Sequence, residues 1–214
     1  GDERNKPKVS RESIAKGPAR GLDNEQPAFV GNQTGDAKAA IATAAKKVEA
    51  VYNYPYQNHA CMEPLNASAL YTADKCEVWC GTQNGEGAFA AVLAASGLPA
   101  DKCDVHKQML GGGFGRRGMN DNVQQAVAIA KQMPGTPIKL LWSREEDMAH
   151  GKFHPVTQCK LTGAFDADNN LTALHVRLSG QSILFSVRPA ALENGRDPAA
   201  FQGLSPSGDA AIGY

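Results

Sequence analysis

The chain contains the glycine-rich run Gly111-Gly112-Gly113-Phe114-Gly115-Arg116-Arg117-Gly118. Residues 104–110 before it alternate polar and apolar side chains, which predicts a short strand leading into the run. Asn120 or Asp121 after it can cap a helix, whose apolar residues recur at helical spacing until Met133-Pro134-Gly135. Glycines lack a Cβ atom and tolerate positive φ, so N–H groups between a strand and a helix can approach an anion closely. The run therefore predicts a cradle for an anion or a cofactor.

Composition limits the class of protein. The 214 residues suffice for one large domain or two small ones, and 42% hydrophobic residues suffice for a packed core. Lys and Arg total 22 and Asp and Glu total 22, so no net charge attracts the chain to nucleic acid or an anionic membrane. The five cysteines have no Cys-x-x-Cys spacing, which disfavours a zinc or iron–sulfur site in this chain. There is no run of about 18 apolar residues, so no membrane-spanning helix is predicted.

Three regions of the chain differ in composition. Residues 1–35 are polar and rich in glycine and proline, which predicts an extended arm or linker. Residues 36–187 carry the periodic segments and predict one α+β domain. Residues 188–214 contain several prolines and glycines and predict a loop-rich connection.

Apolar periodicity within the middle region predicts the fold class. Further helices are expected over 37–50 and 85–96, and further strands over 51–56, 67–72, 77–81 and 138–142. Residues 156–165 and 171–178 alternate around the polar turn 166–170, which predicts a long antiparallel hairpin with one solvated face. The expected fold is therefore α+β, with a mixed β-sheet, packed helices and this hairpin.

The glycine run also admits a second interpretation. Gly113, Gly115 and Gly118 have the Gly-x-Gly-x-x-Gly spacing of dinucleotide-binding loops. However, arginines stand where small residues are usual, and the candidate ribose-binding acid Glu145 comes later than the usual spacing of about 20 residues. A dinucleotide-binding oxidoreductase domain and a non-enzymatic domain remain as alternatives.

Two other segments accompany the run. They read Tyr56-Gln57-Asn58-His59-Ala60-Cys61-Met62-Glu63-Pro64 and Thr82-Gln83-Asn84. In this order and spacing, the three segments resemble the molybdenum-binding subunit of the xanthine dehydrogenase and aldehyde oxidase family, above all the isoquinoline 1-oxidoreductase beta subunits. The resemblance extends over about residues 35–182 and implies that the chain is the first portion of a catalytic subunit.

The resemblance implies a reaction and its partners. The family uses a molybdenum–molybdopterin cofactor, expected here in the cytosine dinucleotide form, and iron–sulfur clusters on a partner subunit. It hydroxylates an N-heterocycle or an aldehyde with water as the oxygen source. The other expected partners are the remainder of the molybdenum subunit and the small-molecule substrate. The general-base glutamate of the family is expected outside this chain, so the chain alone is expected to be inactive, and its compartment, periplasm or cytoplasm, is left open.

The resemblance also implies roles for particular residues. Gln57 matches the family's glutamine beside the molybdenum oxo ligand, and an amide N–H can polarise such an oxygen. No residue of this chain is expected to bind the metal, because the pterin supplies its ligands. His59 is expected to be a structural, hydrogen-bonded histidine.

The glycine loop is expected to bind the cofactor through its main chain. The residues that match the family's loop are Gly112, Gly113, Phe114 and Gly115. Arg116 and Arg117 are expected either to contact phosphate or pterin or to lie in solvent.

Overall fold

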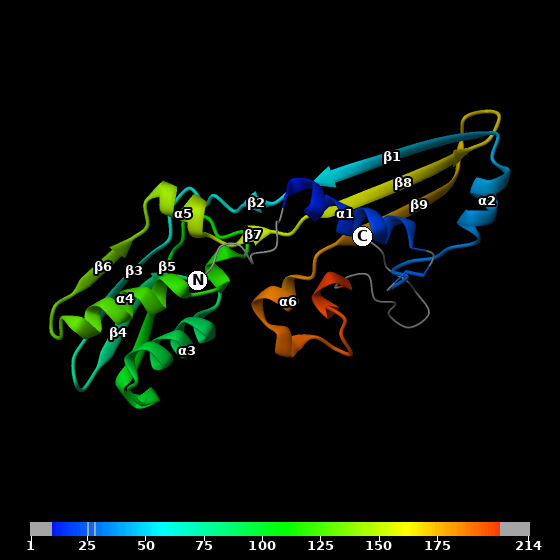
Figure 1. The fold of residues 1–214 in the computed structure, drawn as a ribbon. Coiled ribbons are helices and arrows are strands. Elements are labelled where there is room, and N and C mark those ends of the chain that lie inside the picture. The colour runs from blue at the N-terminus through cyan, green and yellow to red at the C-terminus, as the bar shows by residue number, and fades with distance from the viewer. Residues whose placement is uncertain (1–9, 25, 28, 202–214) are drawn as a thin grey trace, which may run out of the picture. The chain divides into compact units, whose positions relative to one another are not determined.

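The structure is a computed structural model that describes residues 10–24, 26–27 and 29–201. The chain divides into two compact units, unit 1 (Gly1–Gln57 with Pro155–Tyr214) and unit 2 (Asn58–His154). Figure 1 shows the elements of both. The boundaries between the units lie inside the region 36–187 that composition marks as one domain. The short strands β2 (Gln57–Asn58) and β7 (Phe153–His154) form a two-stranded sheet where the chain passes from one unit to the other.

Unit 2 is built on a four-stranded mixed sheet with the order β5-β4-β3-β6. Its strands are β3 (Asn66–Tyr71), β4 (Cys76–Gly81), β5 (Cys103–Gln108) and β6 (Ile138–Leu141). Its helices are α3 (Gly85–Ser96), η2 (Ala100–Lys102), η3 (Arg116–Gly118), α4 (Asp121–Gln132) and α5 (Arg144–His150). β4 and β5 are parallel and joined through α3, whereas β3 pairs antiparallel with both β4 and β6.

The core of unit 2 lies between the sheet and the helices α3 and α4, which pack against each other (Figure 1). Alternate residues of β4 point into it, so Cys76, Val78 and Cys80 are fully buried. α3 begins where Asn84 accepts a hydrogen bond from the Gly87 N–H, and it ends at a left-handed glycine. This β4–α3–β5 arrangement brings the carboxyl ends of two parallel strands to one edge of the sheet.

Unit 1 is built on a three-stranded antiparallel sheet with the order β1-β8-β9. Its strands are β1 (Lys46–Tyr54), β8 (Thr157–Phe165) and β9 (Leu171–Gly180). Its helices are α1 (Arg11–Asp23), α2 (Ala37–Thr43), α6 (Ile183–Val187), η4 (Pro189–Ala191) and η5 (Pro198–Phe201). Both α1 and α2 contact β8 and β9. None of the helices in the described ranges is long and apolar enough to cross a membrane.

Most predicted elements are confirmed, including the long hairpin, which is β8–β9. The helix predicted over 37–50 is wrong beyond Thr43, because Lys46 begins a strand whose residues pair with β8 over its whole length. The extended arm predicted over 1–35 contains α1, which the propensities of its residues do not favour. A capping box between Ser10 and Ser13 starts this helix, and its packing against β9 buries Leu22.

Candidate functional site

The glycine loop follows β5, and Thr82 and Gln83 follow β4, so both segments leave the sheet at the same edge. Ligands of α/β sheets bind outside the carboxyl ends of parallel strands. The Gln83 N–H donates to the Arg117 carbonyl at 3.2 Å, and the Thr82 hydroxyl lies 3.1 Å from the same oxygen. The two segments therefore form one structure.

The backbone of the loop turns sharply and leaves N–H groups free. Gly112, Phe114 and Gly115 have φ values of 97°, 51° and 96°. The φ of Gly113 is not positive, although positive φ is expected of glycines in such a run. The left-handed residues therefore flank Gly113 on both sides. The N–H groups of Gly112, Gly113 and Phe114 have no hydrogen-bond partner among the described residues. Successive free N–H groups next to left-handed residues form an anion-binding concavity.

Gln83 lies directly against this loop. Its side-chain Oε1 accepts a hydrogen bond from the Gly115 N–H at 3.0 Å, which fixes the orientation of the amide. Its Nε2 has no partner in the part of the chain that the structure describes, so two donor hydrogens are available. A Cβ atom at Gly113 would lie 2.5 Å from this Oε1, so the glycine leaves the space that the amide occupies.

The buried Arg117 side chain connects the glycine loop to Glu63. Its side chain is only 1% exposed, and its Nε donates to the Gly112 carbonyl at 2.7 Å. Its Nη2 donates to the Glu63 carboxylate at 2.9 Å and to the Glu63 carbonyl. Glu63 also accepts from the Gly111 N–H at 2.8 Å, so the segment 56–64 and the glycine loop are tied together by a buried guanidinium.

The Arg116 side chain is likewise buried and is paired with a carboxylate. Its two Nη atoms make a bidentate pair with Asp121 at 2.8 and 2.7 Å, and its guanidinium carbon lies 5.5 Å from the Trp142 ring centroid. The expectation that the arginines lie in solvent is wrong, because both are buried. Each retains one buried nitrogen without a hydrogen-bond partner in the described part of the chain, Arg116 Nε and Arg117 Nη1. Their predicted contact with phosphate or pterin stays a prediction.

We expect the stability of this chain to fall at acid pH through Asp121. Burial raises the pKa of Asp121, but the hydrogen bonds and charge of Arg116 and the N–H groups at the start of α4 outweigh burial and hold this pKa below its ordinary value. Unfolded Asp titrates at about pH 3.9, so the ion pair contributes fully above that pH, and its contribution disappears as the pH falls through the lower folded pKa. Urea unfolding at neutral pH and at about pH 3 measures this loss.

Asp121→Asn is the control for this prediction. It should lower the free energy of unfolding at neutral pH by about 3 kcal/mol, because it leaves the buried Arg116 charge uncompensated. The variant should also show a smaller difference in the free energy of unfolding between neutral pH and acid pH. An unchanged acid dependence in the variant would contradict the assignment to Asp121.

The other predicted site residues are Gln57, His59 and Phe114. Gln57 is on β2, at the end of the first segment of unit 1, and the described residues give its side chain no hydrogen bond. His59 has a structural partner, since its Nδ1 lies 3.0 Å from the Lys152 carbonyl and its ring centroid lies 4.1 Å from that of His154. Burial lowers the pKa of His59, which favours the neutral ring. The side chain of Phe114 is exposed at the tip of the loop.

Gln83 belongs to the segment Thr82-Gln83-Asn84 that the family resemblance includes, but no role was predicted for its side chain. It follows β4, whose parallel neighbour β5 leads into the glycine loop, so the pairing of these two strands brings it to the loop. The alternative of a dinucleotide fingerprint does not fit, because the third glycine ends a 3-10 turn and α4 begins only at Asp121. In the described ranges no group of three or more His, Cys, Asp or Glu could hold a metal ion.

These features fit a cofactor that presents oxygen atoms to the loop. The three free N–H groups and the outward amide of Gln83 are donors. The buried Arg116 and Arg117, each paired with a carboxylate, hold the loop in this shape. Gly115 leaves open space for close approach of a bulky group, because a Cβ atom there would have no neighbour within 4 Å.

Comparison with known proteins agrees with this geometry. Residues 22–192 match the family model of the molybdopterin cofactor-binding domain. The chain is 34% identical over 134 residues to the isoquinoline 1-oxidoreductase subunit beta of Brevundimonas diminuta, covering 61% of this chain and 17% of that protein. It is 26% identical over 147 residues to the aldehyde oxidoreductase molybdenum-binding subunit PaoC of Escherichia coli O157:H7, covering 68% and 20%.

Solved structures show the same fold. Quinoline 2-oxidoreductase from Pseudomonas putida 86 matches with a TM-score of 0.55 and 21% identity, over 67% of this chain and 18% of that one. Aldehyde oxidoreductase from Desulfovibrio gigas matches with a TM-score of 0.52 and 20% identity, over 67% and 16%. The chain thus spans about a fifth or less of the length of these relatives.

Proposed function

Because this chain belongs to the molybdopterin cofactor-binding domain family, we propose that its glycine loop holds a molybdenum–pterin cofactor in the catalytic subunit of a molybdenum hydroxylase. One observation carries the proposal. Three successive N–H groups without partners, at Gly112, Gly113 and Phe114, lie beside the free amide donor of Gln83 at the carboxyl edge of the sheet. Donors placed in this way suit the oxygen atoms of such a group.

Each residue of the loop has a separate task in this proposal. The main-chain N–H groups bind the cofactor, and Gln83 donates from Nε2 while the Gly115 N–H fixes its Oε1. Gln57, which the family resemblance singles out, is the second candidate for the amide donor.

Arg117 and Arg116 are positioning residues, because their buried ion pairs with Glu63 and Asp121 set the shape of the loop. Contact of these arginines with phosphate or pterin oxygens would require the loop to move, because their unpartnered nitrogens are buried. The exposed Phe114 ring can pack on a flat substrate and exclude water.

The cofactor, when bound, supplies a metal centre that accepts two electrons while oxygen from water is added to the substrate. We propose an N-heterocycle or an aldehyde as substrate, because relatives carry isoquinoline oxidoreductase and aldehyde oxidoreductase names. We further propose that the electrons pass to iron–sulfur clusters on a partner subunit and that the pterin is the cytosine dinucleotide form. The general base belongs to the part of the subunit outside this chain.

Metal and pterin analysis of the full-length subunit tests the proposal. The subunit, purified with its partner, should contain molybdenum and a pterin in about equal amounts, and these 214 residues alone should contain neither. This is expected because a cofactor between domains needs contacts from both. A bound nicotinamide or flavin nucleotide without molybdenum would instead support a dinucleotide-binding domain and contradict the proposal.

A further inference from the structure

The three-stranded sheet of unit 1 has one apolar and one polar face. Successive residues of a strand point to opposite faces, and the register of β1, β8 and β9 aligns residues of the same kind. Tyr52 pairs with Cys159, which pairs with Leu178, and Ala50 pairs with Leu161, which pairs with Val176. The apolar face, as defined here, consists of Val48, Ala50, Tyr52, Tyr54, Cys159, Leu161, Leu174, Val176 and Leu178.

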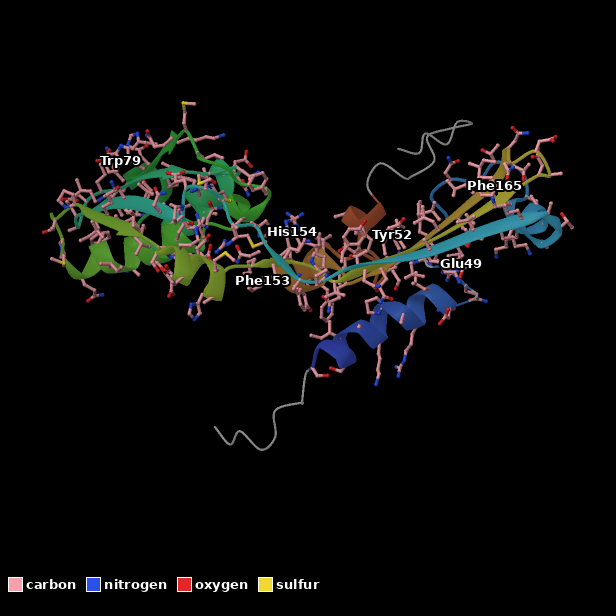
Figure 2. All side chains as sticks on the ribbon, turned by 90° about the horizontal axis from the view of Figure 1, so that it is seen from above. Glu49, Tyr52, Trp79, Phe153, His154 and Phe165 are labelled. Carbon is pink, nitrogen blue, oxygen red and sulfur yellow. The ribbon has the colours of Figure 1, made fainter. Side chains whose placement is uncertain are left out.

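The polar face carries charged and hydrogen-bonding side chains. Lys160 Nζ lies 2.9 Å from a Glu49 carboxylate oxygen, and the Thr162 hydroxyl lies 3.1 Å from the other. α1 lies against this face, because Arg177 Nε donates to the Gly21 carbonyl at 3.2 Å. Figure 2 shows α1 along one side of the sheet and labels Tyr52 on the other side of β1.

Helix α1 therefore packs against the polar face of the sheet, which gains less from burial than the apolar face. Sheets with one solvated face normally bury the apolar side and expose the polar one. Here the large side chains of the apolar face on the two outer strands are about half exposed, with Tyr52 at 54% and Leu178 at 60%. A contiguous exposed apolar surface of this kind marks a site of interaction with protein, membrane or ligand.

The size of the apolar face indicates what covers it. Three strands about 4.8 Å apart and about 30 Å long give a footprint of about 400 Å². A layer that belongs to the same polypeptide can dock on a face of this size without further contacts, because its effective concentration is high. The chain covers only 17% of the length of the isoquinoline oxidoreductase subunit, so most of a relative of that length lies outside it.

We propose that the apolar face of this sheet is the docking surface for a further layer of the same subunit, which places apolar side chains against β1, β8 and β9. The proposal rests on the proposed function in one respect, namely that this chain is part of a longer catalytic subunit. It assigns unit 1 the task of joining the loop-bearing unit 2 to the rest of that subunit. It also accounts for a sheet whose alternation leaves its hydrophobic side without a partner among the described residues.

Cysteine labelling of the full-length subunit tests this surface. Val176→Cys lies on the apolar face and Val51→Cys on the polar face of the same sheet, and the two valines have nearly equal exposure, 48% and 47%. A maleimide is added to each folded variant and to the same variant in urea, and peptide mass spectrometry separates the new sites from the native cysteines. Val176→Cys should react at least about tenfold more slowly in the folded protein than Val51→Cys, and both should react alike in urea.

The labelling results distinguish which protein layer covers the apolar face. Protection of Val176→Cys that persists on dilution, and without the partner subunit, supports a layer of the same polypeptide. Protection that disappears on dilution points to a second copy, and protection that needs the iron–sulfur subunit points to that partner, and either overturns the proposal. Rapid labelling of Val176→Cys in the folded subunit also overturns it. Labelling does not depend on molybdenum, so a failed cofactor analysis and a failed docking surface remain distinguishable.

Discussion

Replacing Gly113 by alanine in the complete enzyme is expected to lower turnover by about a hundredfold and to reduce bound molybdenum, because displacement of a catalytic group by about 1 Å has effects of this size. The new Cβ atom would lie 2.5 Å from Gln83 Oε1 and 2.6 Å from its Cδ. The glutamine side chain must then move, and the Gly115 N–H loses its acceptor. Molybdenum content, turnover and melting temperature should be measured on one preparation.

Gly118→Ala is the matched control for this substitution. Gly118 belongs to the same run, but a Cβ atom there has no neighbour within 4 Å, and its φ is not in the left-handed range. This variant should keep its molybdenum and its activity. If Gly113→Ala also retained both, the loop would be a turn without a role in cofactor binding.

Gln83→Glu is expected to lower turnover per bound molybdenum by about a hundredfold to a thousandfold, the usual effect of removing one donor to a developing charge. Glutamate keeps an acceptor for the Gly115 N–H, so the loop should stay folded and the melting temperature should change little. It lacks the Nε2 hydrogens and, when ionised, adds a negative charge, so the donor is lost and the binding of oxygen atoms is opposed. The measurement is steady-state turnover divided by molybdenum content.

Gln57→Glu provides the comparison, because the family resemblance implies the amide role for Gln57 and we propose it for Gln83. Among the described residues, no hydrogen bond orients the Gln57 amide, so we expect the smaller loss for this variant. A larger loss for Gln57→Glu would show that the assignment from resemblance is right. A loss of stability in Gln83→Glu with full turnover per molybdenum would show that Gln83 only supports the loop.

Local sequence patterns predicted much of unit 2 because its elements have distinct ends. Asn84 and Gly97 delimit α3, and Val78 with its alternate neighbours marks β4 as half buried. The start of β1 was not predicted because its lysines, Glu49 and Ala50 favour a helix, while its strand pairing comes from β8, more than a hundred residues later. Tertiary pairing therefore overrode local propensity there.

The candidate site was predictable as a loop but not as a set of contacts. The glycines at 111–115 indicated close approach of a ligand, and this needed only the residue types. Burial of Arg116 and Arg117 was not predictable, since it depends on Asp121 and Glu63 being placed to neutralise them. The contact of Gln83 with Gly113 and Gly115 depends on the parallel pairing of β4 with β5, which spacing along the chain does not specify.

The insertion of unit 2 between β1 and β8 sets an order of events on the ribosome. Unit 2 is one continuous segment, so it can fold as soon as it has emerged. β1 emerges earlier but must wait for β8, because Tyr54 pairs with Thr157 across the whole insertion. At about 5–20 residues per second, this wait lasts roughly 5–20 s. During that time the valines and tyrosines of β1 have no partner strand and are exposed. Nascent chains stalled within unit 2 should therefore bind chaperones more strongly than chains stalled after β8.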